Sequence, residues 1–101
     1  MSDSAIACLL NAGEYQERLR CIADLNRRFL QSARQNDLAI ALSYHLQAAD
    51  LVHEFVDRER RCCPFLTFHV HQLADCIKLV IIAPQQARPA AEALFEQFRA
   101  G

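Results

Sequence analysis

The segment that most constrains the fold is residues 58–65, Arg-Glu-Arg-Arg-Cys-Cys-Pro-Phe, where two adjacent cysteines precede a proline. Proline lacks a backbone N–H and biases the residue before it away from the α region, so a helix reaching Cys62 should end at Cys63. A strand should then begin near Phe65. This corner puts two thiols side by side, with Glu59 about one helical turn earlier. Consecutive Cα atoms are about 3.8 Å apart, below the usual bridging range of about 4.4–6.8 Å, so Cys62 and Cys63 are poor disulfide partners for each other.

The spacing of apolar residues predicts a small α+β domain that spans residues 1–101. The expected elements, in chain order, are a strand at 5–10, a helix from 14 to about 34, a strand at 38–45, a helix at 48–62, strands at 65–71 and 76–83, and a helix opened by Arg88-Pro89. The resulting order is βαβαββα. Placing the helices on one face of a four-stranded sheet buries every apolar stripe, so we expect a two-layer sandwich. A content of 52% hydrophobic residues is enough for one core.

The other face of this sheet should carry a mixed set of mostly small side chains. Its members are Ala39, Ala41, Ser43, Lys78, Val80 and Ile82. Two interpretations stay open for this surface. It could pair two copies of the chain as a homodimer, or it could be a partly wetted open face.

The charge balance argues against a general nucleic-acid partner. With 11 Lys and Arg against 12 Asp and Glu, the formal net charge is −1, whereas nucleic-acid binders normally carry a basic face. Arg58, Arg60 and Arg61 form a local cluster, which we interpret as the solvated flank of a helix rather than a phosphate site.

We expect a cytoplasmic protein without a membrane partner, because the sequence shows neither signal-peptide regions nor an apolar run able to cross a bilayer. Its five cysteines would then be mostly reduced. Cys8, central in the first predicted strand, is a candidate third sulfur for the corner. Cys21 and Cys76 are interpreted as cysteines that take no part in this site.

Glu59 falls within the apolar stripe of its predicted helix, at about 100° per residue. A carboxylate there is costly unless it is paired, hydrogen-bonded or metal-bound. One explanation is a buried pair with an arginine of the first helix, Arg18 or Arg20. The other is that Glu59 supports the thiols, either by direct contact or through an intervening group. The first is slightly favoured.

The two thiols could serve redox or nucleophilic chemistry, or they could capture a soft metal. A nucleophilic cysteine needs a lowered pKa, but a helix C-terminus and a nearby carboxylate both disfavour a thiolate. A bound cation deprotonates its own thiols, and soft thiolates select ions such as copper, zinc or mercury. Metal capture is therefore preferred over a redox enzyme. Structural core cysteines remain the plain alternative, although two adjacent side chains are not expected to point into the same pocket.

His69 and His71 should lie on one face of their predicted strand, two residues apart. They could hold a metal together, or they could be ordinary solvated strand positions.

Several segments together resemble a family of small bacterial proteins of unassigned activity. The matching residues are Ala7-Cys8-Leu9-Leu10, Arg18 and the corner at 58–65, followed by a hairpin and a closing helix. The corner is also similar to the C-terminal extensions of some mercury-type transcriptional regulators. Related segments often carry an acidic residue where this chain has Arg61. The resemblance implies a heavy-metal context, and it links Cys8 to the corner.

The first hypothesis is thus a small soft-metal-binding protein whose ligands are Cys62, Cys63 and Cys8, with Glu59 nearby. The second is a non-enzymatic interaction module with structural cysteines, which dimerises through the open sheet face or docks on a regulator protein.

Overall fold

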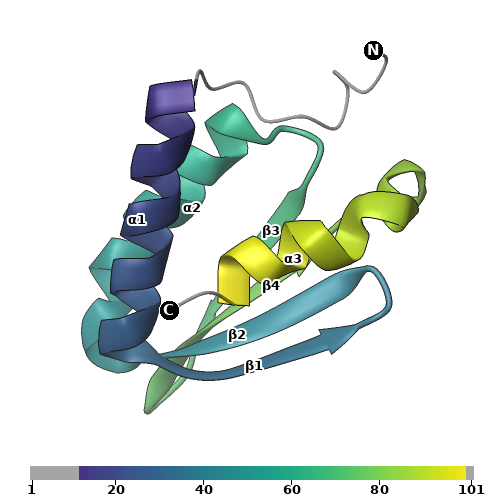
Figure 1. Cartoon of the computed structure of the whole chain (residues 1–101). Coiled ribbons are helices and arrows are strands. Elements are labelled where there is room, and N and C mark those ends of the chain that lie inside the picture. The colour runs from purple at the N-terminus through teal and green to yellow at the C-terminus, as the bar shows by residue number, and fades with distance from the viewer. Residues whose placement is uncertain (1–11, 100–101) are drawn as a thin grey trace.

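The computed structural model describes residues 12–99 of the chain, in which helices cover one face of a four-stranded antiparallel sheet (Figure 1). The elements are α1 (Ala12–Phe29), β1 (Leu30–Asn36), β2 (Ala39–His45), the 3-10 turn η2 (Leu46–Ala48), α2 (Ala49–Cys62), β3 (Thr67–Gln72), β4 (Cys76–Ile82), the 3-10 segment η3 (Gln85–Ala90) and α3 (Ala91–Arg99). The strand order is β1-β2-β4-β3, and each neighbouring pair is antiparallel. The predicted two-layer α+β sandwich is confirmed.

The two central strands, β2 and β4, are where the sequence pattern and the structure agree most closely. Their alternate residues are buried under the helices: Ile40, Leu42 and Tyr44 on β2, and Ile77, Leu79 and Ile81 on β4. The intervening residues, Ala39, Ala41, Ser43, Lys78, Val80 and Ile82, are half-buried or exposed on the opposite face. This is the open face that the period-two alternation predicts.

The first helix ends earlier than its apolar spacing predicts. It stops at Phe29, and residues 30–36 form the edge strand β1 instead of a further helical turn. Asp37 and Leu38 connect β1 to β2 in a hairpin, and Asp37 has a φ of 56°. Aspartate tolerates this left-handed conformation better than most residues, which suits a two-residue hairpin connection. Pairing with β2 thus outweighs the local helical pattern.

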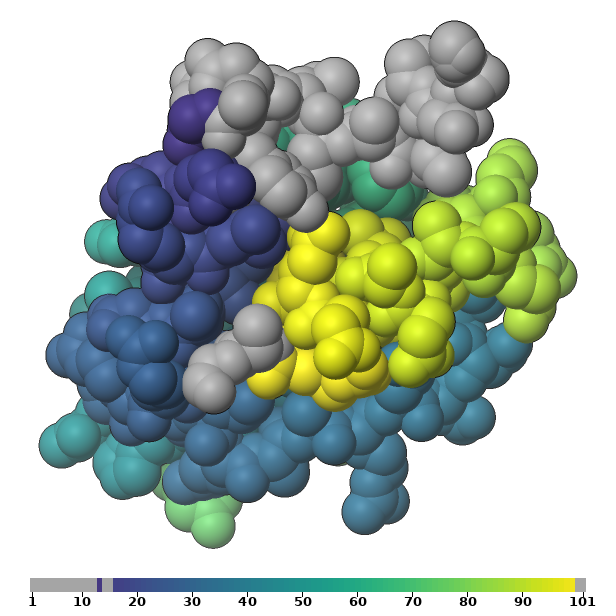
Figure 2. Space-filling view, in the orientation of Figure 1, coloured from purple at the N-terminus to yellow at the C-terminus, as the bar shows by residue number. Residues whose placement is uncertain are grey.

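The other expected elements are found with small shifts at their ends, and the predicted strand at residues 5–10 lies outside the described residues. Pro89 lies in the 3-10 segment η3 that leads into α3. Figure 2 shows the helical side of the molecule, where α3 packs directly against α1 and over the β1–β2 hairpin. Within residues 12–99, no helix is both long enough and apolar enough to span a bilayer.

Candidate functional site

Helix α2 presents the site residues from its inner face. Val52, Phe55, Val56 and Glu59 are all buried, so Glu59 does occupy the apolar stripe. The helix ends at Cys62, and the N–H of Cys63 donates to the carbonyl of Glu59 at 2.7 Å. The predicted break before Pro64 is therefore confirmed.

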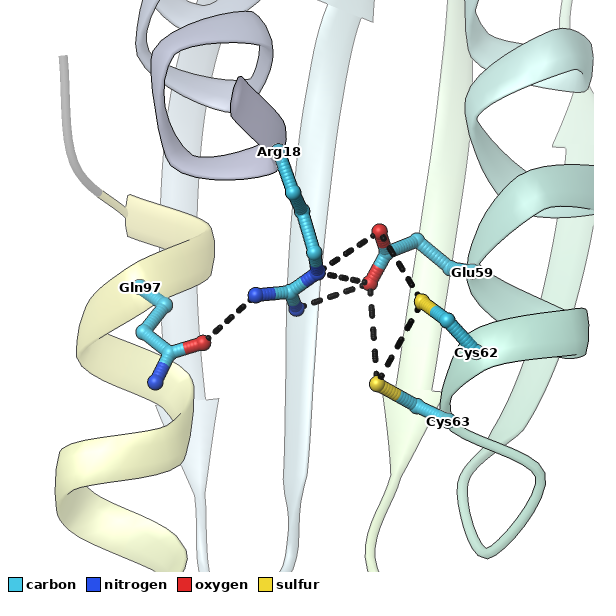
Figure 3. Close-up of polar contacts among 5 residues, drawn as sticks. All are labelled: Arg18, Glu59, Cys62, Cys63 and Gln97. Carbon is cyan, nitrogen blue, oxygen red and sulfur yellow. Dashed lines mark hydrogen bonds and ion pairs between the residues drawn. The ribbon is translucent and has the colours of Figure 1, made fainter. Parts of the chain in front are cut away.

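Glu59 is held by Arg18, which reaches across from α1 (Figure 3). The Arg18 Nε donates to Oε1 at 3.0 Å and to Oε2 at 2.8 Å, and Nη2 donates to Oε1 at 2.8 Å. The side chains of Arg18 and Glu59 are only 2% and 0% exposed. Of the two arginines proposed from sequence, Arg18 is thus the partner, while Arg20 pairs with Glu17 at the surface.

The third helix completes the surroundings of the arginine. Gln97 accepts a hydrogen bond from Arg18 Nη1 at 2.9 Å, and the guanidinium carbon lies 5.4 Å from the centre of the Phe98 ring. Sequence reasoning missed both residues, because nothing local in α3 marks them as partners of a cation on α1. Arg18 therefore connects all three helices at this point.

The sulfurs of Cys62 and Cys63 lie against the same carboxylate, on the side away from Arg18 (Figure 3). The Cys62 sulfur is 3.8 Å from Glu59 Oε2, the Cys63 sulfur is 4.0 Å from Oε1, and the two sulfurs are 3.7 Å apart. Glu59 therefore pairs with an arginine, as proposed, and also lies within 4.0 Å of both sulfurs. The expectation that adjacent cysteines avoid one pocket is wrong. Cys63 leaves the helix with φ −130° and ψ 67°, which turns its side chain inward beside Cys62.

The redox states of the two cysteines differ. Cys63 is disulfide-bonded, whereas Cys21, Cys62 and Cys76 are free. The expectation of mostly reduced thiols thus holds for three of the four described cysteines. Cys8, the proposed third sulfur, lies outside the described residues.

The electrostatics around Cys62 favour the protonated thiol. Burial raises its pKa most, the Glu59 carboxylate raises it further, and the Arg18 guanidinium opposes these effects in part. A protonated thiol is a poor nucleophile.

The ligand atoms of Glu59, Cys62 and Cys63 all lie within 4.8 Å of one another, and the group could hold a metal ion. A disulfide sulfur is not a thiolate, so Cys63 would become a full ligand only after reduction. The remaining candidates lie elsewhere: Cys21 on α1 and Cys76 on β4 are half-buried, and His69 and His71 are exposed on β3. The corner arginines Arg58, Arg60 and Arg61 are not part of this group.

No protein-family model, curated protein or solved structure matches the chain. The similarity to mercury-type regulator extensions stays a prediction, and the function is inferred below from the chemistry of the residues.

Proposed function

We propose that the chain binds one soft metal ion between the sulfurs of Cys62 and Cys63, once the disulfide at Cys63 has been reduced. The observation that carries the proposal is the 3.7 Å separation of the two sulfurs, side by side in a buried site. An ion about 2.3 Å from each sulfur would make an S–metal–S angle of about 107°, which suits a tetrahedral or trigonal shell. Little movement of the corner is then needed for binding.

The charges in the site also suit a cation. Arg18 offsets the charge of Glu59, so two thiolates would carry the remaining charge of about −2. A soft cation offsets this charge in a buried setting, where net charge is costly: mercury(II) would cancel it and copper(I) would halve it. The metal itself promotes loss of the thiol protons, which the surroundings would otherwise retain.

The number of donors favours soft ions of low coordination number. The described residues offer two sulfurs and one carboxylate, and both oxygens of that carboxylate already accept from Arg18. Structural zinc sites almost always have four ligands. Copper(I) and mercury(II) are therefore preferred over zinc, and Cys8 is the proposed third sulfur. Such a protein would act in heavy-metal handling.

The test compares two double variants that each remove two thiols. Cys21→Ser/Cys76→Ser removes cysteines away from the site, and Cys62→Ser/Cys63→Ser removes the corner. Each protein is reduced with a phosphine, freed of reductant under argon, and titrated with copper(I) against a chromophoric chelator. We expect the first variant to bind one ion as wild type does, and the second to bind at least about 100-fold more weakly, because it lacks both of the sulfur ligands that act together in wild type. Equal affinities for the two variants would remove the proposal.

The disulfide provides a second arm of the same experiment. Protein that has not been reduced should bind copper(I) more weakly than reduced protein, because Cys63 cannot ligate as a thiolate. Equal binding by oxidised and reduced protein would contradict the assignment of Cys63 as a ligand.

The second candidate is an interaction module, favoured by a sheet face that no helix within residues 12–99 covers and at whose centre Ala41 and Val80 lie. In this case two copies would pair through that face and the cysteines would be structural. Val80→Glu should then turn a dimer into a monomer in sedimentation equilibrium, with Glu17→Gln on α1 as a control. A wild-type protein that is monomeric at about 100 μM would speak against it, because a specific dimer of standard interface size is normally formed well below that concentration.

A further inference from the structure

Two histidines form a pair on the open side of the sheet, away from the helices. His69 and His71 lie on the edge strand β3, and both are exposed. Their ring centres are 6.5 Å apart and their planes differ by 26°. Residues two apart on a strand are separated by about 6.6–6.8 Å along it, so the two rings stand out from the sheet side by side.

The strand next to this pair contributes no carboxylate. His69 is opposite Val80 of β4, and His71 is opposite Lys78. The open-face residues of β1 and β2 are likewise free of acidic side chains. A cation held here would therefore be bound by imidazole nitrogens rather than by carboxylates.

Two neutral imidazoles are good ligands for one class of ion. Imidazole suits zinc, nickel and copper(II), and each bond from a ring nitrogen to zinc is about 2.0–2.1 Å long. A single ion with bonds of about 2.0–2.1 Å can hold both rings only after the rings turn toward each other from this side-by-side arrangement. Its remaining positions would face solvent and could be filled by water.

We propose that His69 and His71 form a two-histidine site for a borderline divalent cation such as zinc or nickel. This site is chemically distinct from the thiol corner, which suits softer ions. It stands on its own geometry, and neither Cys62 nor Cys63 takes part in it.

The other two histidines supply internal controls. His45 accepts a hydrogen bond from the N–H of Gln47 through Nδ1 at 3.1 Å, and His53 is exposed on α2. Zinc is added to the isotope-labelled protein, and the imidazole C–H signals are followed by NMR. We expect the signals of His69 and His71 to shift together while those of His45 and His53 stay in place.

Calorimetric titration with nickel then tests the need for both rings. His69→Gln and His71→Gln should each weaken binding by about 100-fold, because either change leaves a single ligand where two had acted together. His53→Gln should leave the affinity unchanged, and so should Cys76→Ser, which alters a free thiol on the same sheet face. Because all these side chains are exposed or half-buried, the variants should fold.

Either of two results would overturn the proposal. One is an affinity that neither His69→Gln nor His71→Gln changes. The other is a loss on only one of these substitutions, which would show a single-histidine contact.

Discussion

The buried ion pair between Arg18 and Glu59 allows one stability prediction to be worked out in detail. The change is Glu59→Gln, which keeps the size of the side chain and removes its charge. Arg18 donates three hydrogen bonds to Glu59 within 3.0 Å, and both side chains are almost completely buried. After the substitution, the guanidinium would stay in the core without its counter-charge, and the amide nitrogen of the introduced glutamine would face other donors.

The expected loss of unfolding free energy is about 3–5 kcal/mol, the range found when one partner of a buried pair is removed. No discount for solvent screening applies, since the side chains are 2% and 0% exposed. For a domain of about 100 residues, each kcal/mol lowers the Tm by about 4–8 °C. The Tm should therefore fall by about 12 °C or more.

The assay is urea unfolding at pH 7, with wild type and variant in the same redox state and with the free energy taken by linear extrapolation. Glu17→Gln is the matched control, because the Arg20–Glu17 pair lies at the surface with side chains 70% and 67% exposed. Its loss should be below about 1 kcal/mol.

A double substitution keeps the reasoning testable if Glu59→Gln does not fold. Arg18→Met/Glu59→Leu removes both charges and should be close to wild type in stability or up to about 4 kcal/mol more stable. A Glu59→Gln protein within about 1 kcal/mol of wild type would refute the account. The role of Glu59 would then lie in the thiol site rather than in the stability of the fold.

Three further outcomes are expected. Tyr44→Phe should cost about 0.5–1.5 kcal/mol in urea unfolding, because it removes the buried hydrogen bond from the Tyr44 hydroxyl to Asn26 Oδ1; an unchanged midpoint would contradict this. The hydrogen bond from Arg88 holds the pKa of Asp37 below its usual value. The pair therefore stabilises the fold at pH values above about 4, the pKa of an aspartate in the unfolded chain. This stabilisation is lost as the pH falls through the lower pKa that Asp37 has in the folded protein. The stability difference between wild type and Asp37→Asn should therefore shrink in acid, and a difference that grows would refute it. Finally, Cys62 is 6% exposed with a raised pKa, so native alkylation followed by mass spectrometry should modify it more slowly than the two half-buried free cysteines, and equal rates would argue against a buried thiol.

Several features of the site could be predicted from local sequence because they depend on neighbours along the chain. Proline at position 64 ends α2, and the helical period places Glu59 on the same face as Val52 and Phe55. The alternation in β2 and β4 likewise separates the covered face of the sheet from the open one. Each of these follows from backbone geometry over a few residues.

Other features depended on residues far apart in the chain. The segment at 30–36 carries apolar residues that fit a helix, yet it pairs with β2, and no local pattern weighs that pairing against another helical turn. The order β1-β2-β4-β3, with β4 in the centre, is likewise a result of long-range pairing.

The site itself combines both kinds of information. The sequence alone determined that a carboxylate would lie inside the domain near two cysteines, because α2 carries Glu59 and Cys62 and ends directly before Cys63. Only the tertiary structure decided that Arg18 rather than Arg20 reaches Glu59, that Gln97 holds the same guanidinium, and that both sulfurs share one pocket. Residues two positions apart, such as Arg18 and Arg20, point about 200° apart around a helix. The packing of α1 against α2 and α3 therefore selects which arginine is buried.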